Sequence, residues 1–170
     1  GRGILLEYLK KKKFDNGIGV DISKEQIELA QSKGLNVIED DILRFLEISD
    51  SSFDIIFAID LIEHFDKREL LKLFNLFHNK LKEKEILILQ TPNGQAIFSG
   101  RLIYGDLTHL TIFTPGSLKQ ILKISGFKEI LFYEKGPVMK NLVGIVRSIL
   151  WYIIKFIYNA FLSVESGRRE

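Results

Sequence analysis

An acidic residue, Asp21, ends a short run of glycine and β-branched residues, and a helical pattern follows it at once. A run of this composition indicates a buried parallel strand, and ligands of open α/β sheets bind outside the carboxyl ends of such strands. A carboxylate there can accept two hydrogen bonds from the vicinal hydroxyls of a ribose. Gly1 and Gly3 lie about 20 residues upstream, before the helical run that begins at Ile4, as in nucleotide-binding loops. Together these residues predict a nucleotide cofactor, although strand-end aspartates that only cap the next helix are also common.

Short apolar runs along the chain predict strands, and amphipathic stretches between them predict helices. This alternation indicates a Rossmann-like, doubly wound α/β fold with a mostly parallel sheet. The run from Phe53 to Ile59 gives the clearest strand pattern. Residues 95–114 have no regular period, so we expect a loop or lid with short helical pieces there. The expected strands are 17–21, 35–38, 53–59, 85–90 and 127–133, and the expected helices are 4–12, 24–33, 66–83, 115–126 and 139–163.

The sequence shows capping residues at the ends of one expected helix and an amphipathic pattern along another. Ser23 is a suitable N-cap for the helix that follows it, with Gln26 completing a capping box, and Gly34 suits the C′ position at the other end. Helix 66–83 is amphipathic, and its apolar residues are expected to face inward. These residues are Leu70, Leu71, Leu73, Phe74, Leu76, Phe77 and Leu81.

The composition is that of an ordinary globular protein. The chain has 170 residues, a length that is enough for one domain with a sizeable core. Of these residues, 46% are hydrophobic and 27% are charged, as in soluble globular proteins. A formal net charge of +2 is too small to indicate nucleic-acid binding. The absence of cysteine excludes disulfides and thiolate metal sites. No secretory signal and no uninterrupted apolar run of spanning length is present. We therefore expect a domain over residues 1–135 and an apolar helical extension over 136–170.

These motifs resemble the class I S-adenosylmethionine-dependent methyltransferases, and more narrowly the small-molecule branch that includes the ubiquinone-biosynthesis O-methyltransferases. The resemblance covers residues 1–134. In that family the first strand ends in an acidic residue followed by Gly-x-Gly-x-Gly, of which this chain has the last two glycines, Gly1 and Gly3. We therefore expect the first strand to be missing, and the chain to stop before the family's last strand.

The resemblance implies S-adenosylmethionine as the cofactor. It places the residues that follow three strands around the cofactor: Asp21 at the ribose with Ile22 beside the adenine, Asp41 and Ile42 at the adenine amino group, and Asp60 and Leu61 at the methionine part. Asp41 has an alternative role, because it also suits the N-cap of the helical turn from Ile42 to Leu46.

Two histidines are the candidate catalytic residues. His64 follows the strand that ends at Ile59, where an acceptor hydroxyl would lie, and a histidine there can act as a general base. His109 lies in the irregular segment that the family uses over its acceptor pocket. Alternatively, both side chains are structural. Asp60, Glu63 and His64 also resemble the Glu-x-x-Glu-His metal motif of the ubiquinone-pathway relatives, but Asp60 is one methylene shorter than the residue it replaces. We therefore assign no metal and keep these three residues as candidates.

The sequence thus predicts methyl transfer to an oxygen of a small or lipid-linked acceptor, such as a sugar or quinone precursor, with nitrogen and carbon acceptors less favoured. One alternative is a nicotinamide-dependent oxidoreductase, which uses the same glycine and aspartate pattern. Its Tyr-x-x-x-Lys motif occurs here only from Tyr8 to Lys12, in the wrong helix. Another is a non-catalytic module that docks on a membrane or partner. We expect a cytoplasmic protein, with residues 139–163 in peripheral contact with the inner face of the membrane.

Overall fold

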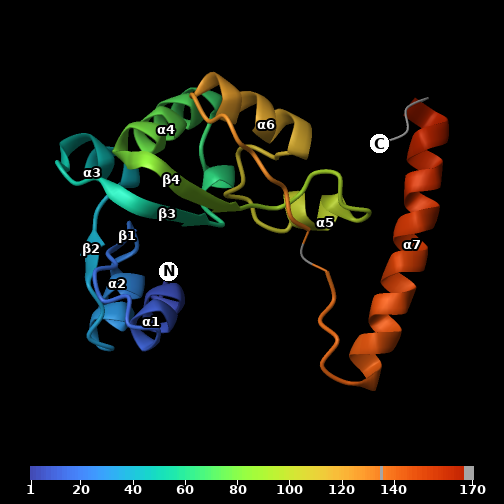
Figure 1. The fold of residues 1–170 in the computed structure, drawn as a ribbon, viewed down its shortest axis with the longest axis horizontal. Helices are drawn as coiled ribbons and strands as arrows, with labels where there is room; N and C mark the ends of the chain where they lie inside the picture. The colour runs from blue at the N-terminus through green and yellow to red at the C-terminus, as the bar shows by residue number, and fades with distance from the viewer. Residues whose placement is uncertain (135, 167–170) are drawn as a thin grey trace.

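A computed structural model describes residues 1–134 and 136–166 (Figure 1). The strands of this part of the chain form two parallel pairs. One pair is β1 (Gly19–Asp21) with β2 (Val37–Glu39), and the other is β3 (Phe53–Ile59) with β4 (Leu81–Gln90). The helices are α1 (Ile4–Lys11), α2 (Lys24–Gln31), α3 (Ile42–Ile48), the 3-10 helix η1 (Ile62–His64), α4 (Lys67–Lys80), α5 (Ser99–Ile103), α6 (Pro115–Ile124) and α7 (Leu142–Ser166).

Parallel strands joined through helices confirm the predicted Rossmann-like α/β fold. Figure 1 shows α1 and α2 beside the β1–β2 pair, while α3, α4 and α6 cover the β3–β4 pair. β1, β2 and β4 end at the polar residues Asp21, Glu39 and Gln90, and β3 is followed directly by Asp60. In the described residues the two pairs are separate two-stranded sheets.

The core lies between the β3–β4 pair and α4. Asp66 caps α4 in a capping box, in which its Oδ1 atom accepts from the Glu69 N–H at 2.9 Å while Glu69 Oε2 accepts from the Asp66 N–H at 3.0 Å. One face of α4 is then buried at helical spacing, with Leu70, Leu73, Phe74 and Phe77 each at most 1% exposed. This face packs α4 on the β3–β4 pair, and the carboxyl end of β3 leads into the candidate site.

The predicted helix 66–83 was too long, and its predicted buried face included a residue that is exposed. The helix stops at Lys80, because Leu81 pairs with Phe53 as the first residue of β4. Leu71 is 40% exposed, since it lies about 100° around the helix from Leu70 and outside the buried stripe. The other elements that form lie where they were predicted, but most of their ends differ by one to four residues. The strand Phe53–Ile59 has the predicted ends, and Gly34 is at C′, where its N–H donates to the Gln31 carbonyl at 2.8 Å.

The expected strand over 127–133 is absent from the described structure. Ile130 packs against the core, and the ring of Phe127 meets that of His78 edge-on at 5.2 Å. Leu131 and Tyr133, however, are 76% and 88% exposed, and no ladder is formed by this segment. An extended apolar segment becomes a strand only when a neighbouring edge satisfies its backbone groups.

The expected C-terminal helix is confirmed as α7, which begins at Leu142. It stands apart from the rest of the chain (Figure 1) and contacts it through the Tyr158 hydroxyl, which donates to the Gln95 carbonyl at 3.1 Å, and through an ion pair between Lys155 and Glu134. By length and composition alone, Leu142–Glu165 is the one helix of the described chain that could cross a membrane.

Candidate functional site

The carboxyl end of β1 brings Asp21 beside the glycine loop. Asp21 Oδ1 accepts from the Ser23 N–H at 2.8 Å, and Oδ2 contacts the amino group of Gly1. The Asp21 side chain is 24% exposed, so the carboxylate is accessible at the sheet edge. Ser23 caps α2 by accepting from the Gln26 N–H, as predicted. The reciprocal bond of a capping box does not form, because the Ser23 N–H is bound to Asp21.

Gly3 is required at the start of α1 by its conformation and its surroundings. Its φ is +75°, in the left-handed region that favours glycine. A Cβ atom at this position would lie 2.5 Å from Leu35 Cδ1 and 3.2 Å from Ala30 Cβ. Gly3 therefore lets the start of α1 approach Ala30 of α2 and Leu35 before β2 closely.

Asp41 follows β2 and caps α3. Its Oδ1 atom accepts from the Arg44 N–H at 3.1 Å, so the alternative role predicted for this residue is present in the structure. A carboxylate has a second oxygen, and a cofactor contact through it is compatible with the cap. The two apolar candidates differ, since Ile22 is 74% exposed while Ile42 packs against the core. Ile22 is the one with an open face for a flat ring.

Asp60 directly follows β3 in a backbone conformation rare for a residue with a side chain. Its φ is +48°, in the left-handed region, where aspartate is one of the few enriched residues other than glycine. Both carboxylate oxygens accept from Gln90 Nε2, at 3.1 and 3.2 Å, and so the ends of β3 and β4 are tied together. Leu61 packs against the core beside them. Asp60 is exposed, and it is held at the sheet edge where the predicted cofactor site lies.

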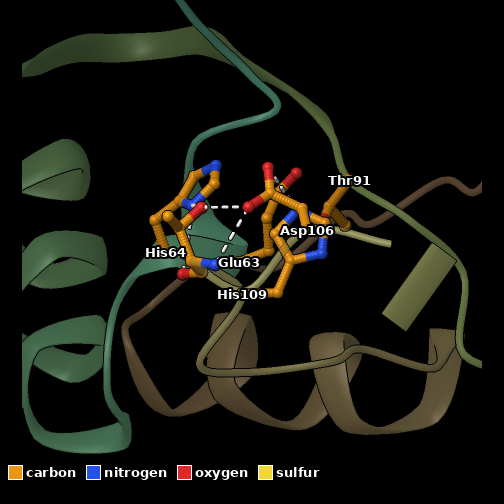
Figure 2. A network of polar contacts seen from close by, with 6 residues as sticks. Glu63, His64, Thr91, Asp106 and His109 are labelled. Atoms are coloured by element: carbon orange, nitrogen blue, oxygen red, sulfur yellow. Dashed lines mark hydrogen bonds and ion pairs between the residues drawn. The ribbon is translucent and has the colours of Figure 1, made fainter. Parts of the chain in front are cut away.

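Beyond Asp60 the chain enters η1, which buries a carboxylate. Glu63 is 1% exposed, and its Oε2 atom accepts from the Thr91 hydroxyl at 3.0 Å. Its main-chain carbonyl accepts from the N–H groups of Leu110 and Thr111, at 2.8 and 3.0 Å. The irregular segment after β4 is therefore fastened across η1, and it places its own polar residues beside Glu63 and His64 (Figure 2).

A chain of hydrogen bonds in this segment orients His64. The Thr108 hydroxyl donates to Asp106 Oδ1 at 2.6 Å and lies 3.0 Å from His64 Nδ1, and the Thr108 carbonyl lies 3.2 Å from the same nitrogen. A hydroxyl has one proton, which here goes to Asp106, so His64 Nδ1 must be the donor toward Thr108. In a neutral ring this leaves Nε2 as the basic nitrogen. The network thus assigns the tautomer that a general base requires.

Asp106 is the acidic end of this chain. The hydrogen bond from the Thr108 hydroxyl lowers the pKa of the Asp106 carboxyl, and the Thr108 N–H and the nearby His109 and His64 rings lower it further. The lowered pKa favours the ionised form of the Asp106 carboxyl.

The structure brings the two candidate catalytic histidines together. The ring centroids of His64 and His109 are 5.1 Å apart, and the His109 side chain is 10% exposed, with Nε2 at 4.0 Å from Asp106 Oδ2. One ligand atom each from Glu63, His64 and His109 lies within 4.8 Å of the others. The candidate metal set Asp60, Glu63 and His64 is thus replaced by one with His109 as third member, while Asp60 is bound to Gln90.

Sequence reasoning assigned no role to Thr91 or to Thr108. Thr91 comes directly after β4, and its partner Glu63 is distant in the sequence. Thr108 had a local signal, since an aspartate two residues before a threonine commonly forms such a turn. That turn is present, with the Thr108 N–H donating to Asp106 Oδ1 at 2.9 Å. Its contact with His64 depends on the tertiary fold.

Parallel strands that end at acidic residues, with a glycine loop beside the first, define a Rossmann-like nucleotide-binding protein. A family model described as a methyltransferase domain matches residues 1–131. The chain therefore belongs to the methyltransferase domain family, with the class I fold and S-adenosylmethionine as cofactor.

Solved structures agree with this assignment. A methyltransferase from Archaeoglobus fulgidus that depends on S-adenosylmethionine is 26% identical with a TM-score of 0.69, over 86% of this chain and 72% of that one. A protein from Thermotoga maritima, described as an S-adenosylmethionine-dependent methyltransferase and possible histamine N-methyltransferase, is 20% identical with a TM-score of 0.60, over 76% of this chain and 60% of that one. No match was found among curated proteins. The narrower resemblance to the ubiquinone-biosynthesis enzymes stays a prediction.

Proposed function

We propose that this methyltransferase acts on a hydroxyl oxygen of a small or lipid-linked acceptor, with His64 as the general base. The observation that carries the proposal is the chain from Asp106 through Thr108 to His64 Nδ1, which leaves Nε2 to take the acceptor proton. S-adenosylmethionine supplies an activated methyl group when bound, so the protein needs no covalent nucleophile. Its residues have to align the acceptor and remove one proton.

His109 and Asp106 assist His64 in this proposal. The His109 ring lies beside the His64 ring. In this proposal it contacts the part of the acceptor next to the reacting hydroxyl. The Asp106 carboxylate stabilises the imidazolium that forms on His64. Asp21, Asp41 and Asp60, at the ends of β1, β2 and β3, hold the cofactor through its ribose, adenine and methionine parts.

The surface of the irregular segment supports an acceptor with an apolar part. Leu107, between Asp106 and Thr108, is 96% exposed, and Leu110 is 64% exposed. Phe98 and Tyr104, on either side of α5, are each 81% exposed. The segment that carries Asp106, Thr108 and His109 thus also exposes apolar side chains, which suits a hydroxylated acceptor with a lipid or ring. We place the reaction in the cytoplasm.

A second use of the same cluster is a metal site. One carboxylate and two imidazoles are a donor set that suits a transition metal better than magnesium, and their approach within 4.8 Å favours this alternative. The two uses exclude one another, because His64 Nε2 serves either as a base or as a ligand.

The test measures transfer of a labelled methyl group from S-adenosylmethionine to a panel of hydroxylated aromatic compounds and sugars. We expect O-methyl products, identified by mass spectrometry. We expect His64→Ala to reduce kcat by about 10²- to 10⁴-fold while cofactor affinity is unchanged. His78→Ala, on the exposed side of α4, is the matched histidine control. Products methylated on nitrogen or carbon, or full activity in His64→Ala, would contradict the proposal. Cofactor binding without transfer to any acceptor would favour the non-catalytic module.

A further inference from the structure

One face of α7 is apolar along its whole length and uncovered. At 3.6 residues per turn, six side chains form a stripe along this face, and each is between 50% and 76% exposed. They are Val146, Ile149, Leu150, Ile153, Phe156 and Ile157. Monomeric proteins rarely expose an apolar patch of this extent without a binding role.

The opposite face of α7 is the one that contacts the protein. Gly144 and Ser148 are buried on it, and a Cβ atom at Gly144 would lie 2.5 Å from the Val138 carbonyl oxygen. Farther along the same face, Lys155 pairs with Glu134, and the Tyr158 hydroxyl donates to the Gln95 carbonyl. These contacts set the rotation of α7, so the apolar stripe points away from the segment that the helix packs on.

The charged residues of α7 avoid this stripe. Within Leu142–Glu165 they are Arg147, Lys155 and Glu165, and helical geometry places all three outside it. Arg147 lies at one margin of the apolar face and Tyr152, which is 66% exposed, lies at the other. Lys140, just before the helix, is exposed as well. A cation and a tyrosine beside an apolar face are typical of residues at the headgroup level of a bilayer.

We propose that α7 binds the surface of an anionic bilayer, lying in the membrane plane with the apolar stripe among the acyl chains. The exposed cations Lys140 and Arg147 complement anionic headgroups. A spanning orientation is disfavoured, because Lys155 is half-way along the helix and is paired with Glu134 of the segment before α7. A second copy of this chain is the other possible occupant, but the stripe offers no polar group to fix a protein partner. The inference does not depend on the proposed reaction.

Flotation of the full chain with lipid vesicles tests binding. We expect it to float with vesicles containing phosphatidylglycerol and much less with phosphatidylcholine alone. Ile153→Glu puts a charge in the stripe and should reduce partitioning by at least about tenfold. The matched control is Asn159→Glu, which adds the same charge at an exposed position outside the stripe and should have a much smaller effect. A thermal melt of both variants checks that they fold. If the unaltered chain does not float, the proposal is overturned. Sedimentation would then show whether the chain is a monomer or a dimer.

Trp151, the single tryptophan of the chain, tests the orientation. It lies on the protein-facing side of α7, whereas Ile153 is about 3 Å farther along the axis and on the opposite side. With brominated lipids in the vesicles, we expect weak quenching of Trp151 fluorescence. We expect strong quenching in a chain with Trp151→Phe and Ile153→Trp. Equal quenching at both positions is the result of a spanning helix and would overturn the in-plane orientation.

Discussion

Thr108 holds the Nδ1 atom of His64 through two of its own atoms, the carbonyl oxygen at 3.2 Å and the hydroxyl at 3.0 Å. The two residues belong to different parts of the chain, η1 and the irregular segment after α5. The basic nitrogen of His64 is therefore set by a residue that need not contact the substrate. Thr108 is a positioning residue in the proposed reaction.

Replacement of this hydroxyl should alter catalysis without affecting cofactor binding. Thr108→Val keeps the carbonyl contact and removes the hydroxyl, which breaks the link between Asp106 and His64. Loss of one neutral hydrogen bond of about 1 kcal/mol corresponds to a reduction of about fivefold in kcat, together with a shifted pH profile. Steady-state kinetics across pH measure both. Thr111→Val, which removes the hydroxyl bond to the Phe65 carbonyl, is the control for a purely structural effect.

Asp21 should contribute to cofactor affinity. A hydrogen bond to a charged group contributes roughly 1.5–3 kcal/mol, so Asp21→Ala should weaken S-adenosylmethionine binding by roughly ten- to a hundredfold. Asp21→Asn should lose less, because its amide oxygen still accepts one bond. Calorimetric titration gives the affinity, and a melting curve on the same variant reports any loss of the bond to the Ser23 N–H. A lower melting temperature with unchanged affinity would refute the ribose contact.

The two roles of Asp41 can be separated by a serine. Asp41→Ser keeps an N-cap oxygen for α3 and removes the charge, whereas Asp41→Ala removes both and should destabilise the fold by about 1 kcal/mol. If Asp41 also accepts from the adenine amino group, both variants should bind the cofactor more weakly, and only the alanine variant should melt earlier. Normal affinity in Asp41→Ser would limit this residue to the cap.

The carboxyl of Asp106 should make folding stability depend on pH in acid. Its pKa is lowered in the folded state by the Thr108 hydroxyl. The contribution of Asp106 is therefore complete above the unfolded pKa of about 3.9 and is lost as the pH falls through the lower folded pKa. The free energies of urea unfolding of the wild type and of Asp106→Asn should differ between pH 5 and 7. The difference should shrink below about pH 4. Asp15→Asn, at an exposed position outside the cluster, is the control.

Chelation distinguishes the base from the metal ligand at His64. With His64 as a general base, we expect methyl transfer to survive exhaustive removal of divalent cations. Glu63→Gln should also keep most of the activity, because its amide oxygen can accept from the Thr91 hydroxyl. Loss of activity on chelation, restored by one added transition metal, would instead assign Glu63, His64 and His109 as ligands.

Local patterns predicted the elements whose structure is determined locally. The run Phe53–Ile59 is apolar except at Asp54 and contains three isoleucines, and its ends were found at the predicted residues. Gly34 was placed at C′ because few other residues tolerate that position. Segment 127–133 has the same kind of composition, but a strand also needs a bonded neighbour, which composition does not supply. Leu81 likewise joined a strand through its pairing with Phe53.

The sequence predicted which residues belong to the candidate site, but it did not predict how they are arranged in space. His64 and His109 were both selected, but the sequence contains nothing that brings them together. Their contact depends on the bonds from Leu110 and Thr111 to the Glu63 carbonyl, which form between distant segments. Asp60 was grouped with Glu63 and His64 because of its spacing. Its left-handed backbone and its bonds to Gln90 place it outside their cluster.

The hydrogen bonds from the Leu110 and Thr111 N–H groups to the Glu63 carbonyl also anchor one end of the segment between β4 and α6. We expect the parts of this segment to differ in mobility. One anchor is at Leu110 and Thr111, and a second is the bridge of Asn93 with Phe113. We therefore expect the stretch between these anchors, which contains α5, to be more mobile, and its amide protons should exchange with solvent early in a deuterium-exchange experiment. For the proposed reaction we expect His109, next to the anchor at Leu110, to keep its place beside His64 when α5 moves.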